Sequence, residues 1–393
     1  MTGSIDKYMT KGSSKPHWRY RIYTGKDEAG RKQYVTRAGF EKQGEAADTM
    51  RDRIEELRRL ANQPASPEEI SLGSWLARWI DTYAVHTCQP KTIERYRQLA
   101  KYITDATADE ISSVSRAPIS SLKHVQLEAG LRALLKQKGV RREHISARTV
   151  RHVAGLVQVA LNEAFRLDLI LVNPMLKVKL PSVEQRQANS LTPEQLRALR
   201  ETCRGDWTFA LVELASALGA RRGELLALEW RDLDWVSGQL LISKSLEQTK
   251  AGLRVKRPKN GKSRLCRLPK SALVALQFLR DQQNEHRRLF AGQYRDLGLI
   301  FCQPDGSYHE PDLISQVIIR RMRKAGIANA SLHTLRHTHT SHLLSNGVPL
   351  PGVSAQLGHA NPNVTARIYS HALPADDQRA ADVWDAIVDA KVQ

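Results

Sequence analysis

One stretch near the carboxyl end, residues 331–371, carries the chemistry that most constrains the fold. His333 and Arg336 are three residues apart at a predicted helix start, so both side chains project from one face, which can hold an anion. His359 follows in a Leu-Gly-His turn, and Tyr369 comes after an Asn-Pro turn. A tyrosine beside such a site can attack a phosphorus centre if its proton is removed or shared. The chain must then fold so that Tyr369 returns to the helix that carries Arg336.

Each of these residues also has a simpler explanation. A tyrosine in a half-apolar stretch belongs more often to a core or an interface than to an active site. Three further histidines of the stretch have no obvious role: His337, His339 and His342. The ordered set as a whole, rather than any one residue, favours a functional interpretation.

An arginine and a glutamate recur at the same spacing farther upstream. Arg221 and Glu224 stand at a predicted helix start, directly after an apolar helix over residues 207–217. A carboxylate at this spacing can orient a guanidinium so that its planar face meets a phosphate. An ordinary surface ion-pair cluster is the alternative.

A basic segment follows. Residues 250–270 hold nine Lys and Arg and no acid, with strands predicted over 239–243 and 264–268. A lysine at the tip of a hairpin in this segment could enter a DNA groove and protonate a leaving oxygen. It could equally serve as a nonspecific clamp on the phosphate backbone.

The remaining chain shows recognisable periodicities. Trp18, Tyr20 and Ile22 alternate with arginines, which predicts a half-buried strand; a second strand follows across a turn, and then a helix over residues 46–60. Thr192 begins a capping box at the start of a later domain. Further predicted helices cover residues 72–83, 91–103, 124–138, 146–167, 271–290, 311–325 and 376–392, and a short strand is predicted near 299–301.

The charge balance indicates a polyanionic partner. The chain has 60 Lys and Arg against 41 Asp and Glu, a net charge of +19. The excess is spread as +5 over residues 1–65, +6 over 66–180 and +8 over 181–393. Nucleic acid is therefore the first candidate, and several domains should touch it. A generally basic protein without a polyanionic partner is the alternative.

Cysteine usage and hydropathy suggest where the protein works. Four cysteines, Cys88, Cys203, Cys266 and Cys302, are far apart, which argues against a zinc site and a disulfide framework. No long apolar run favours secretion or membrane spanning. We expect a cytoplasmic, nucleoid-associated protein without a membrane partner.

Together, these residues resemble the tyrosine recombinase, or phage integrase, family. His333-x-x-Arg336, Leu-Gly-His359 and Tyr369 are similar to the second conserved box of that family. Gly219-Ala-Arg221-x-x-Glu224 is similar to its first box, and Pro258-Lys259 to its lysine turn. Two departures occur. An Asn-Gly-Lys sequence follows Lys259 where Thr is frequent, which leaves Lys256 and Lys262 open for its role, and Leu-Gly-Ala replaces the usual Thr-Gly-Leu.

The resemblance implies DNA strand exchange without a cofactor or a metal. Tyr369 would attack the scissile phosphate and form a 3′-phosphotyrosine intermediate, with charge stabilised by Arg221, Arg336 and His359. Lys259 would be the general acid, and Glu224 would support the first arginine. His333 would either hydrogen-bond the phosphate or accept the tyrosine proton.

The resemblance also implies a multidomain architecture, mainly α with small β-sheets. An N-terminal sheet-plus-helix domain for arm-type DNA sites would cover residues 1–62, an all-helical core-binding domain 68–175, and an α+β catalytic domain with a C-terminal docking helix 188–393. The expected DNA contacts are Arg19, Arg21, Lys32, Arg37, Lys91, Arg95, Arg148, Arg151, Lys256 and Lys262.

The implied role is a site-specific integrase of a phage or mobile element. It would act as a homo-tetramer on double-stranded attachment sites, with an excisionase or a host DNA-bending protein as a further partner. Two other classes remain open: a noncatalytic architectural DNA-binding protein on the same scaffold, and a type IB topoisomerase, which shares the chemistry but acts as a monomer. The extra N-terminal module favours an integrase over a resolvase of chromosome dimers.

Overall fold

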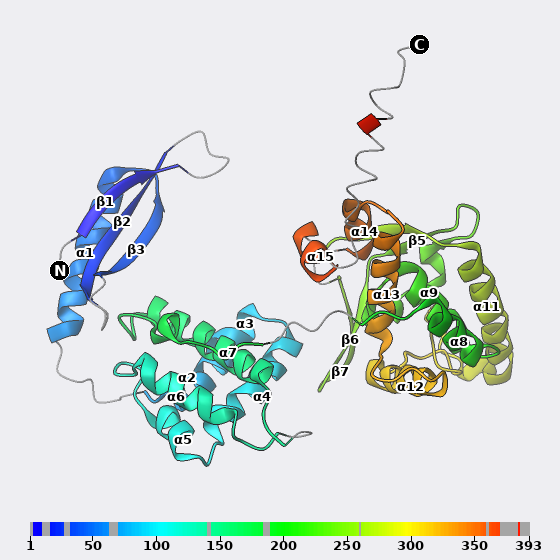
Figure 1. Cartoon of the computed structure of the whole chain (residues 1–393), viewed down its shortest axis with the longest axis horizontal. Coiled ribbons are helices and arrows are strands. Elements are labelled where there is room, and N and C mark those ends of the chain that lie inside the picture. The colour runs from blue at the N-terminus through cyan, green and yellow to red at the C-terminus, as the bar shows by residue number, and fades with distance from the viewer. Residues whose placement is uncertain are drawn as a thin grey trace, which may run out of the picture. The chain divides into compact units, whose positions relative to one another are not determined.

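The computed structural model describes most of the chain. The described residues are 3–9, 16–26, 32–62, 70–139, 143–183, 189–258, 261–358, 361–369 and 384–385. The chain divides into two compact units, residues 1–184 and 185–393, whose elements Figure 1 labels in order. The predicted helix over 376–392 lies outside the described residues, apart from two helical positions at Trp384 and Asp385.

The chain begins with a three-stranded antiparallel sheet backed by one helix. The elements are β1 (Gly3–Tyr8), β2 (His17–Lys26), β3 (Lys32–Phe40) and α1 (Gln43–Asn62), with the strands in the order β1-β2-β3. Tyr20, Ile22 and Phe40 pack against Ala46 and Leu57 of α1. Strands β2 and β3 and the helix were predicted. Strand β1 was missed because its mainly polar sequence lacks an apolar alternation.

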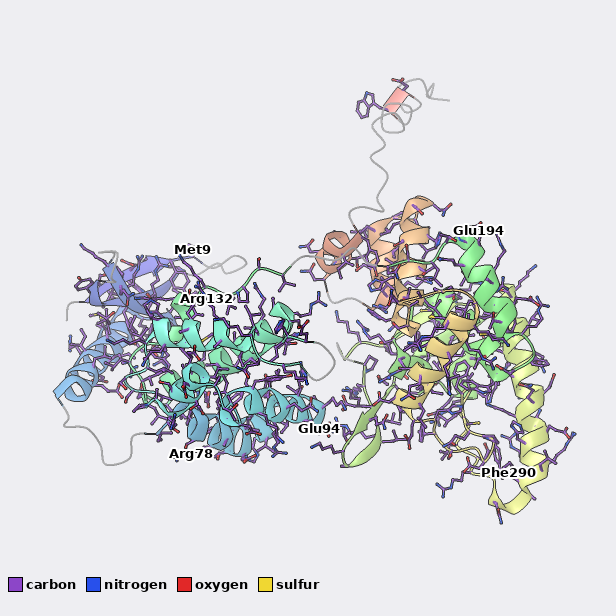
Figure 2. The ribbon with its side chains drawn as sticks, turned by 60° about the horizontal axis from the view of Figure 1, so that its bottom comes forward. Met9, Arg78, Glu94, Arg132, Glu194 and Phe290 are labelled. Carbon is purple, nitrogen blue, oxygen red and sulfur yellow. The ribbon has the colours of Figure 1, made fainter. Side chains whose placement is uncertain are left out.

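An all-helical segment follows. Its elements are α2 (Leu72–Trp79), the π-helix η1 (Ile80–Ala84), α3 (Val85–Thr87), α4 (Pro90–Thr104), α5 (Asp109–Arg116), α6 (His124–Leu134), α7 (Ala147–Arg166) and the 3₁₀-helix η2 (Pro174–Lys177). Trp75 is fully buried, and its indole Nε1 donates to the Ala160 carbonyl of α7 at 2.8 Å. Arg78 and Arg132 point outward from this core (Figure 2). The apolar stripe that the sequence predicted from Leu72 onward is thus the helix face that is buried in this core.

The second unit wraps helices around two small sheets. Its helical elements are α8 (Pro193–Cys203), α9 (Trp207–Leu218), α10 (Arg222–Leu225), η3 (Trp230–Asp232), α11 (Lys270–Phe290), η4 (Ala291–Gln293), α12 (Pro311–Lys324), α13 (Leu332–Ser345), α14 (Leu350–Leu357) and α15 (Pro362–Tyr369). Its strands are β4 (Leu233–Asp234), β5 (Gln239–Ile242), β6 (Ser245–Thr249), β7 (Gly252–Lys256) and β8 (Arg264–Arg267). As predicted, Thr192 caps α8: the Gln195 N–H donates to its hydroxyl, and the Gln195 side chain accepts from the Thr192 N–H.

The two strands predicted around the basic segment form as β5 and β8 and pair antiparallel, but two further strands, β6 and β7, lie between them in the chain. Strand β7 pairs with β6, whereas β8 pairs with β5 in the sheet of order β4-β5-β8. The segment between β7 and β8 therefore connects two sheets and does not join the two strands of one hairpin. The predicted strand near 299–301 is also wrong. An isolated bridge joins Leu299 to Glu229 there, and the Ile300 N–H donates to the Leu228 carbonyl at 2.9 Å, but the pairing does not extend into a strand. The side chains of Ile300 and Phe301 are buried in the core.

Helix α13 runs through the middle of this unit and packs against α9 (Figure 1). Its sequence has apolar or small residues on several sides, so Leu332, Leu335 and Leu344 are all buried. Thr338 ties the helix to the start of the unit, because its hydroxyl accepts from the Leu191 N–H at 2.8 Å. This anchoring gives the polar side chains of α13 a rigid support.

Candidate active site

The first arginine of the site is held by a turn. Gly219 ends α9 in the left-handed conformation, with φ +56°, and Arg221 precedes the first turn of α10. The Glu224 carboxylate accepts from the Arg221 N–H at 3.0 Å and from its guanidinium Nη1 at 2.9 Å. The predicted spacing of three therefore produces a capping box that orients the guanidinium.

A second arginine, missed in the sequence, shares this carboxylate. Arg264 on β8 donates from Nη2 to Glu224 Oε2 at 2.7 Å, and both side chains are almost completely buried. Burial alone would raise the pKa of Glu224, but the hydrogen bond and charge of Arg264, followed by those of Arg221, hold it below its ordinary value. The alternation of β8 predicted a strand but could not show which residue its arginine would meet.

Arg336 is buried in the centre of the site, with 3% of its surface exposed. Its Nη1 donates to the Gly219 carbonyl at 2.5 Å and its Nη2 to the Leu357 carbonyl at 3.0 Å. Burial, followed by the charge of Arg221, lowers the pKa of Arg336 to about 10, so the guanidinium stays charged at neutral pH. These bonds tie α13 to the ends of α9 and α14.

Two histidines of α13 lie one turn apart beside Arg336. The rings of His333 and His337 meet edge to face, with centroids 4.6 Å apart. His333 is exposed, whereas His337 is half-buried. Although the His333 side chain reaches solvent, neighbouring atoms remove part of its hydration, and this loss, followed by the charges of Arg336 and Arg221, lowers its pKa. The positive charges of Arg336 and Arg221 therefore act on His333 directly.

Tyr369, at the end of α15, returns to α13 as predicted. Its side chain is 2% exposed and packs with Leu344, Val353 and Leu357. Its hydroxyl lies 2.5 Å from Nδ1 of His337. Burial raises the pKa of Tyr369, and the Thr340 hydroxyl and the Arg336 charge oppose this only in part. At neutral pH the tyrosine is a protonated nucleophile that needs an acceptor for its proton.

Family models match both parts of this chain. The model described as the phage integrase family matches residues 189–376, and the model described as an arm DNA-binding domain matches residues 4–57. The chain belongs to the phage integrase family of tyrosine recombinases. A tyrosine recombinase XerC-like protein of Caldanaerobacter subterraneus subsp. tengcongensis is 24% identical over 391 residues, which cover 94% of this recombinase and 96% of that relative.

Other relatives agree with this membership. The ICEBs1 integrase of Bacillus subtilis is 22% identical over 311 residues, covering 77% of this chain and 80% of that protein. The Tn1549 transposon integrase in complex with transposon right end DNA has a TM-score of 0.66 at 19% identity, over 80% of this chain and 99% of that one. A lambda integrase tetramer bound to a Holliday junction has a TM-score of 0.55 at 17% identity, over 87% of this chain and 93% of that one. The likeness to these structures shows the recombinase fold.

Two of the expected catalytic residues, Lys259 and His359, lie outside the described residues. Of the alternatives for the lysine, Lys256 sits on β7 and its ammonium group contacts the Glu247 carboxylate of β6. Lys262 is exposed between β7 and β8. Because the contact with Glu247 holds its ammonium group on the β6–β7 sheet, Lys256 is the weaker of these two alternatives.

The predicted basic residues of the arm sheet divide between its two faces. Arg21 pairs across from Ser4 and Thr36, on the face opposite α1, where a hollow of about 380 Å³ is lined by Gly3, Ser4, Arg21, Tyr23, Lys32 and Tyr34. Asp6 of β1 contacts Arg21 at 2.7 Å and Arg19 at 3.6 Å, which reduces their net charge. Arg37 pairs across from Tyr20 and therefore belongs to the face that α1 covers.

The predicted basic residues of the helical segment remain at its surface. Arg95 and Arg148 are exposed. Lys91 pairs with Glu94 at 3.3 Å, and Arg151 donates to the Pro181 carbonyl at 3.1 Å. Within the described part of the chain, Arg95 and Arg148 thus make no side-chain hydrogen bond or ion pair that would compete with a phosphate.

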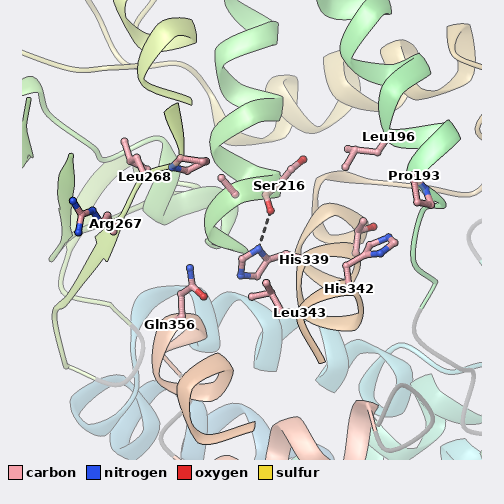
Figure 3. Close-up of a pocket in the computed structure, with 12 residues that line it drawn as sticks. Pro193, Leu196, Ser216, Arg267, Leu268, His339, His342, Leu343 and Gln356 are labelled. Atoms are coloured by element: carbon pink, nitrogen blue, oxygen red, sulfur yellow. Dashed lines mark hydrogen bonds between the residues drawn. The ribbon is translucent and has the colours of Figure 1, made fainter. Parts of the chain in front are cut away.

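The opposite side of α13 borders a groove of about 620 Å³ (Figure 3). His339 donates from Nδ1 to the Ser216 carbonyl at 2.8 Å, and His342 donates from Nε2 to the Leu191 carbonyl at 2.9 Å. These two histidines hold α13 in place and do not reach Tyr369. In the described part of the chain, no cluster of His, Cys, Asp and Glu could hold a metal ion. None of the described helices has the length and apolar character needed to cross a bilayer.

Proposed function

We propose that this recombinase cleaves and rejoins DNA at specific sites through a 3′-phosphotyrosine intermediate, and so integrates and excises a mobile element. The observation that carries the proposal is the position of the Tyr369 hydroxyl, which lies against the helix that also supplies Arg336 and His333. Attack on a phosphodiester requires a nucleophile that is held beside groups able to bind the phosphate.

In the proposed reaction, the Tyr369 oxygen attacks the scissile phosphorus and the 5′ oxygen leaves. Arg221 and Arg336, with His359, stabilise the charge on the pentavalent transition state, and His333 hydrogen-bonds the phosphate. A preorganised donor of this kind contributes about 2.7–4 kcal/mol. Lys259 protonates the 5′ oxygen. The phosphotyrosine bond conserves the energy of the broken bond, so that a new strand can be joined.

The proposal also assigns a separate role to each domain of the chain. Residues 1–62 bind arm-type sites, residues 68–175 clasp the core site, and residues 188–393 carry the chemistry. The exposed basic and aromatic face of the arm sheet, with Arg21 and Lys32, supports the first assignment. A C-terminal helix docks on a neighbouring protomer in a homo-tetramer on DNA, and an excisionase or a host DNA-bending protein sets the direction.

The test is a suicide-substrate assay on the wild type and on Tyr369→Phe. Nicked duplexes from the ends of the element trap the cleaved state as a protein–DNA adduct that survives denaturation. We expect an adduct with the wild type only, and equal DNA affinity for both proteins, because the variant loses one oxygen and no phosphate contact. Recombinants from Tyr369→Phe would remove Tyr369 from the proposal. A wild type that binds but forms no adduct would favour an architectural protein, and relaxation of plasmids by monomers would favour a topoisomerase.

A further inference from the structure

The two histidines of the active site face different groups. His333 is exposed and lies near the charges of Arg336 and Arg221. His337, one turn later, has its Nδ1 atom 2.5 Å from the Tyr369 hydroxyl, and the two rings are tilted with centroids 5.6 Å apart. The histidine that meets the nucleophile is therefore the one to which the sequence assigned no role.

We infer that His337 is the catalytic residue that takes the proton from Tyr369 when the tyrosine attacks the phosphate. The inference rests on the proposed function and assigns one step within it. It replaces the alternative in which His333 accepts this proton, and it leaves His333 as a donor to the phosphate.

The surroundings of Tyr369 leave few other acceptors. Because its side chain is 2% exposed, bulk water has little access to the hydroxyl. Among the described residues, the polar groups that act on the hydroxyl are His337, Thr340 and Arg336. The Thr340 hydroxyl already donates to the Arg336 carbonyl at 2.8 Å, and neither a hydroxyl nor a guanidinium is a base at neutral pH. Among the described residues around Tyr369, only the His337 imidazole can receive a proton.

The step balances in both directions. In cleavage, the bond from the Tyr369 oxygen to phosphorus forms, the bond from phosphorus to the 5′ oxygen breaks, and the tyrosine proton moves to Nδ1 of His337. The leaving oxygen takes its proton from Lys259. In rejoining, a 5′ hydroxyl gives its proton to Lys259 and bonds to phosphorus, the bond from phosphorus to the Tyr369 oxygen breaks, and His337 returns its proton to that oxygen. His337 thus acts first as a base and then as an acid.

The groups around His337 favour its neutral form, so that it can hold the tyrosine proton only transiently. In the described part of the chain, the titratable or charged groups that act on it are His333 and Arg336 on its own helix and Tyr369 on α15. Burial, followed by His333 and Arg336, lowers the pKa of His337 to about 4. The imidazole is consequently neutral at physiological pH. Since the same groups make the imidazolium unfavourable, the proton should move as the bond to phosphorus forms and not before.

The experiment compares three proteins, the wild type, His337→Ala and His337→Asn, on two suicide duplexes. One duplex has the natural 5′ oxygen at the scissile bond, and the other has a bridging sulfur, which leaves without protonation. Lys259→Ala serves as the comparison variant, because the sulfur duplex should restore its cleavage. Thermal midpoints and DNA affinities confirm that each variant is folded.

We expect His337→Ala to cleave the oxygen duplex about 10²–10⁴-fold more slowly than the wild type, with no recovery on the sulfur duplex. His337→Asn should be similarly slow, because its amide oxygen accepts a hydrogen bond but no proton. On the sulfur duplex between pH 6 and 9, the wild type should be nearly independent of pH, since a base with a pKa of about 4 is already unprotonated. His337→Ala should accelerate by about tenfold per pH unit, because hydroxide replaces the missing base.

Three results would overturn the assignment: a wild-type rate for His337→Asn, recovery of His337→Ala on the sulfur duplex, or a flat pH profile for His337→Ala. Each would make His337 a structural or positioning residue. A wild type that gives no adduct on either duplex would instead refute the proposed function, and the assignment of His337 with it. The two failures are therefore distinguishable.

Discussion

At the scale of single residues, the carboxylate of Glu224 joins two cations that are far apart in the sequence. It is 1% exposed and binds Arg221 and Arg264. We expect Glu224→Gln to lower the free energy of unfolding by about 3–5 kcal/mol, because two buried or half-buried guanidiniums lose their counter-charge. Cleavage should also fall, since Arg221 loses its orientation. Thermal unfolding and the adduct assay measure the two effects.

The pH dependence of this loss has a defined sign. The folded-state pKa of Glu224 is lowered, so its contribution to stability is present above the ordinary pKa of a glutamate and disappears as the pH falls through the folded value. The deficit of Glu224→Gln should therefore shrink in acid. Glu201→Gln is the matched control, because Glu201 pairs with Arg204 in an exposed bridge at 2.9 Å and should cost no more than about 1 kcal/mol. Equal losses for both variants would contradict the role of Glu224.

At the scale of elements, the turn between α9 and α10 depends on close packing at Gly219. A Cβ atom there would lie 2.8 Å from side-chain carbons of both His339 and Leu357, and φ is +56°. We expect Gly219→Ala to cost about 1–2 kcal/mol for the backbone and about 1–3 kcal/mol more for the overlap. Because the Gly219 carbonyl accepts from Arg336, cleavage should fall more than stability alone explains.

Gly205→Ala separates these two costs. Gly205 also has a positive φ, +90°, but a Cβ atom there would meet nothing within 4 Å. The control should therefore show the backbone cost alone and retain cleavage. If both variants cleave equally well, the turn at Gly219 does not position Arg336.

At the scale of the whole molecule, the arm sheet has a core of its own. The buried residues of the helical segment form a separate cluster that contains none of residues 1–62. We expect deletion of residues 1–62 to leave cleavage of a core-site duplex unchanged and to abolish integration. Unchanged integration in a two-duplex joining assay would remove the arm-binding role from this domain.

Point variants of the arm sheet test the same role without deletion. Lys32→Ala removes a cation from the basic and aromatic hollow, and should reduce the salt dependence of arm-site binding, the slope of log K against log salt, by about 1. Arg51→Ala removes an equal charge from α1, where Arg51 is highly exposed and pairs with Asp48 at 3.3 Å. This control should leave the slope unchanged. A slope that falls equally in both variants would indicate general charge attraction and no specific face.

The sequence by itself determined the elements with strong local patterns and the identity of the family. The apolar stripe beginning at Leu72 predicted a buried helix face, and the pattern at Thr192 predicted its capping box. Local spacing sufficed because backbone dihedrals, caps and burial faces are set by residues within one or two turns. The order of Arg221, Arg336 and Tyr369 along the chain likewise carried the resemblance to the recombinases, because their residue types and spacings are visible without a fold.

Only the tertiary structure decided which side chains meet. Arg264 binds a carboxylate 40 positions earlier, and Tyr369 meets His337 rather than His333. The polar strand β1 places Asp6 beside Arg19 and Arg21, whereas Arg37 belongs to the other face of the sheet. These pairings depend on how helices and strands pack over long separations. A difference of one turn of α13 determines which histidine reaches the nucleophile, and no local pattern contains that information.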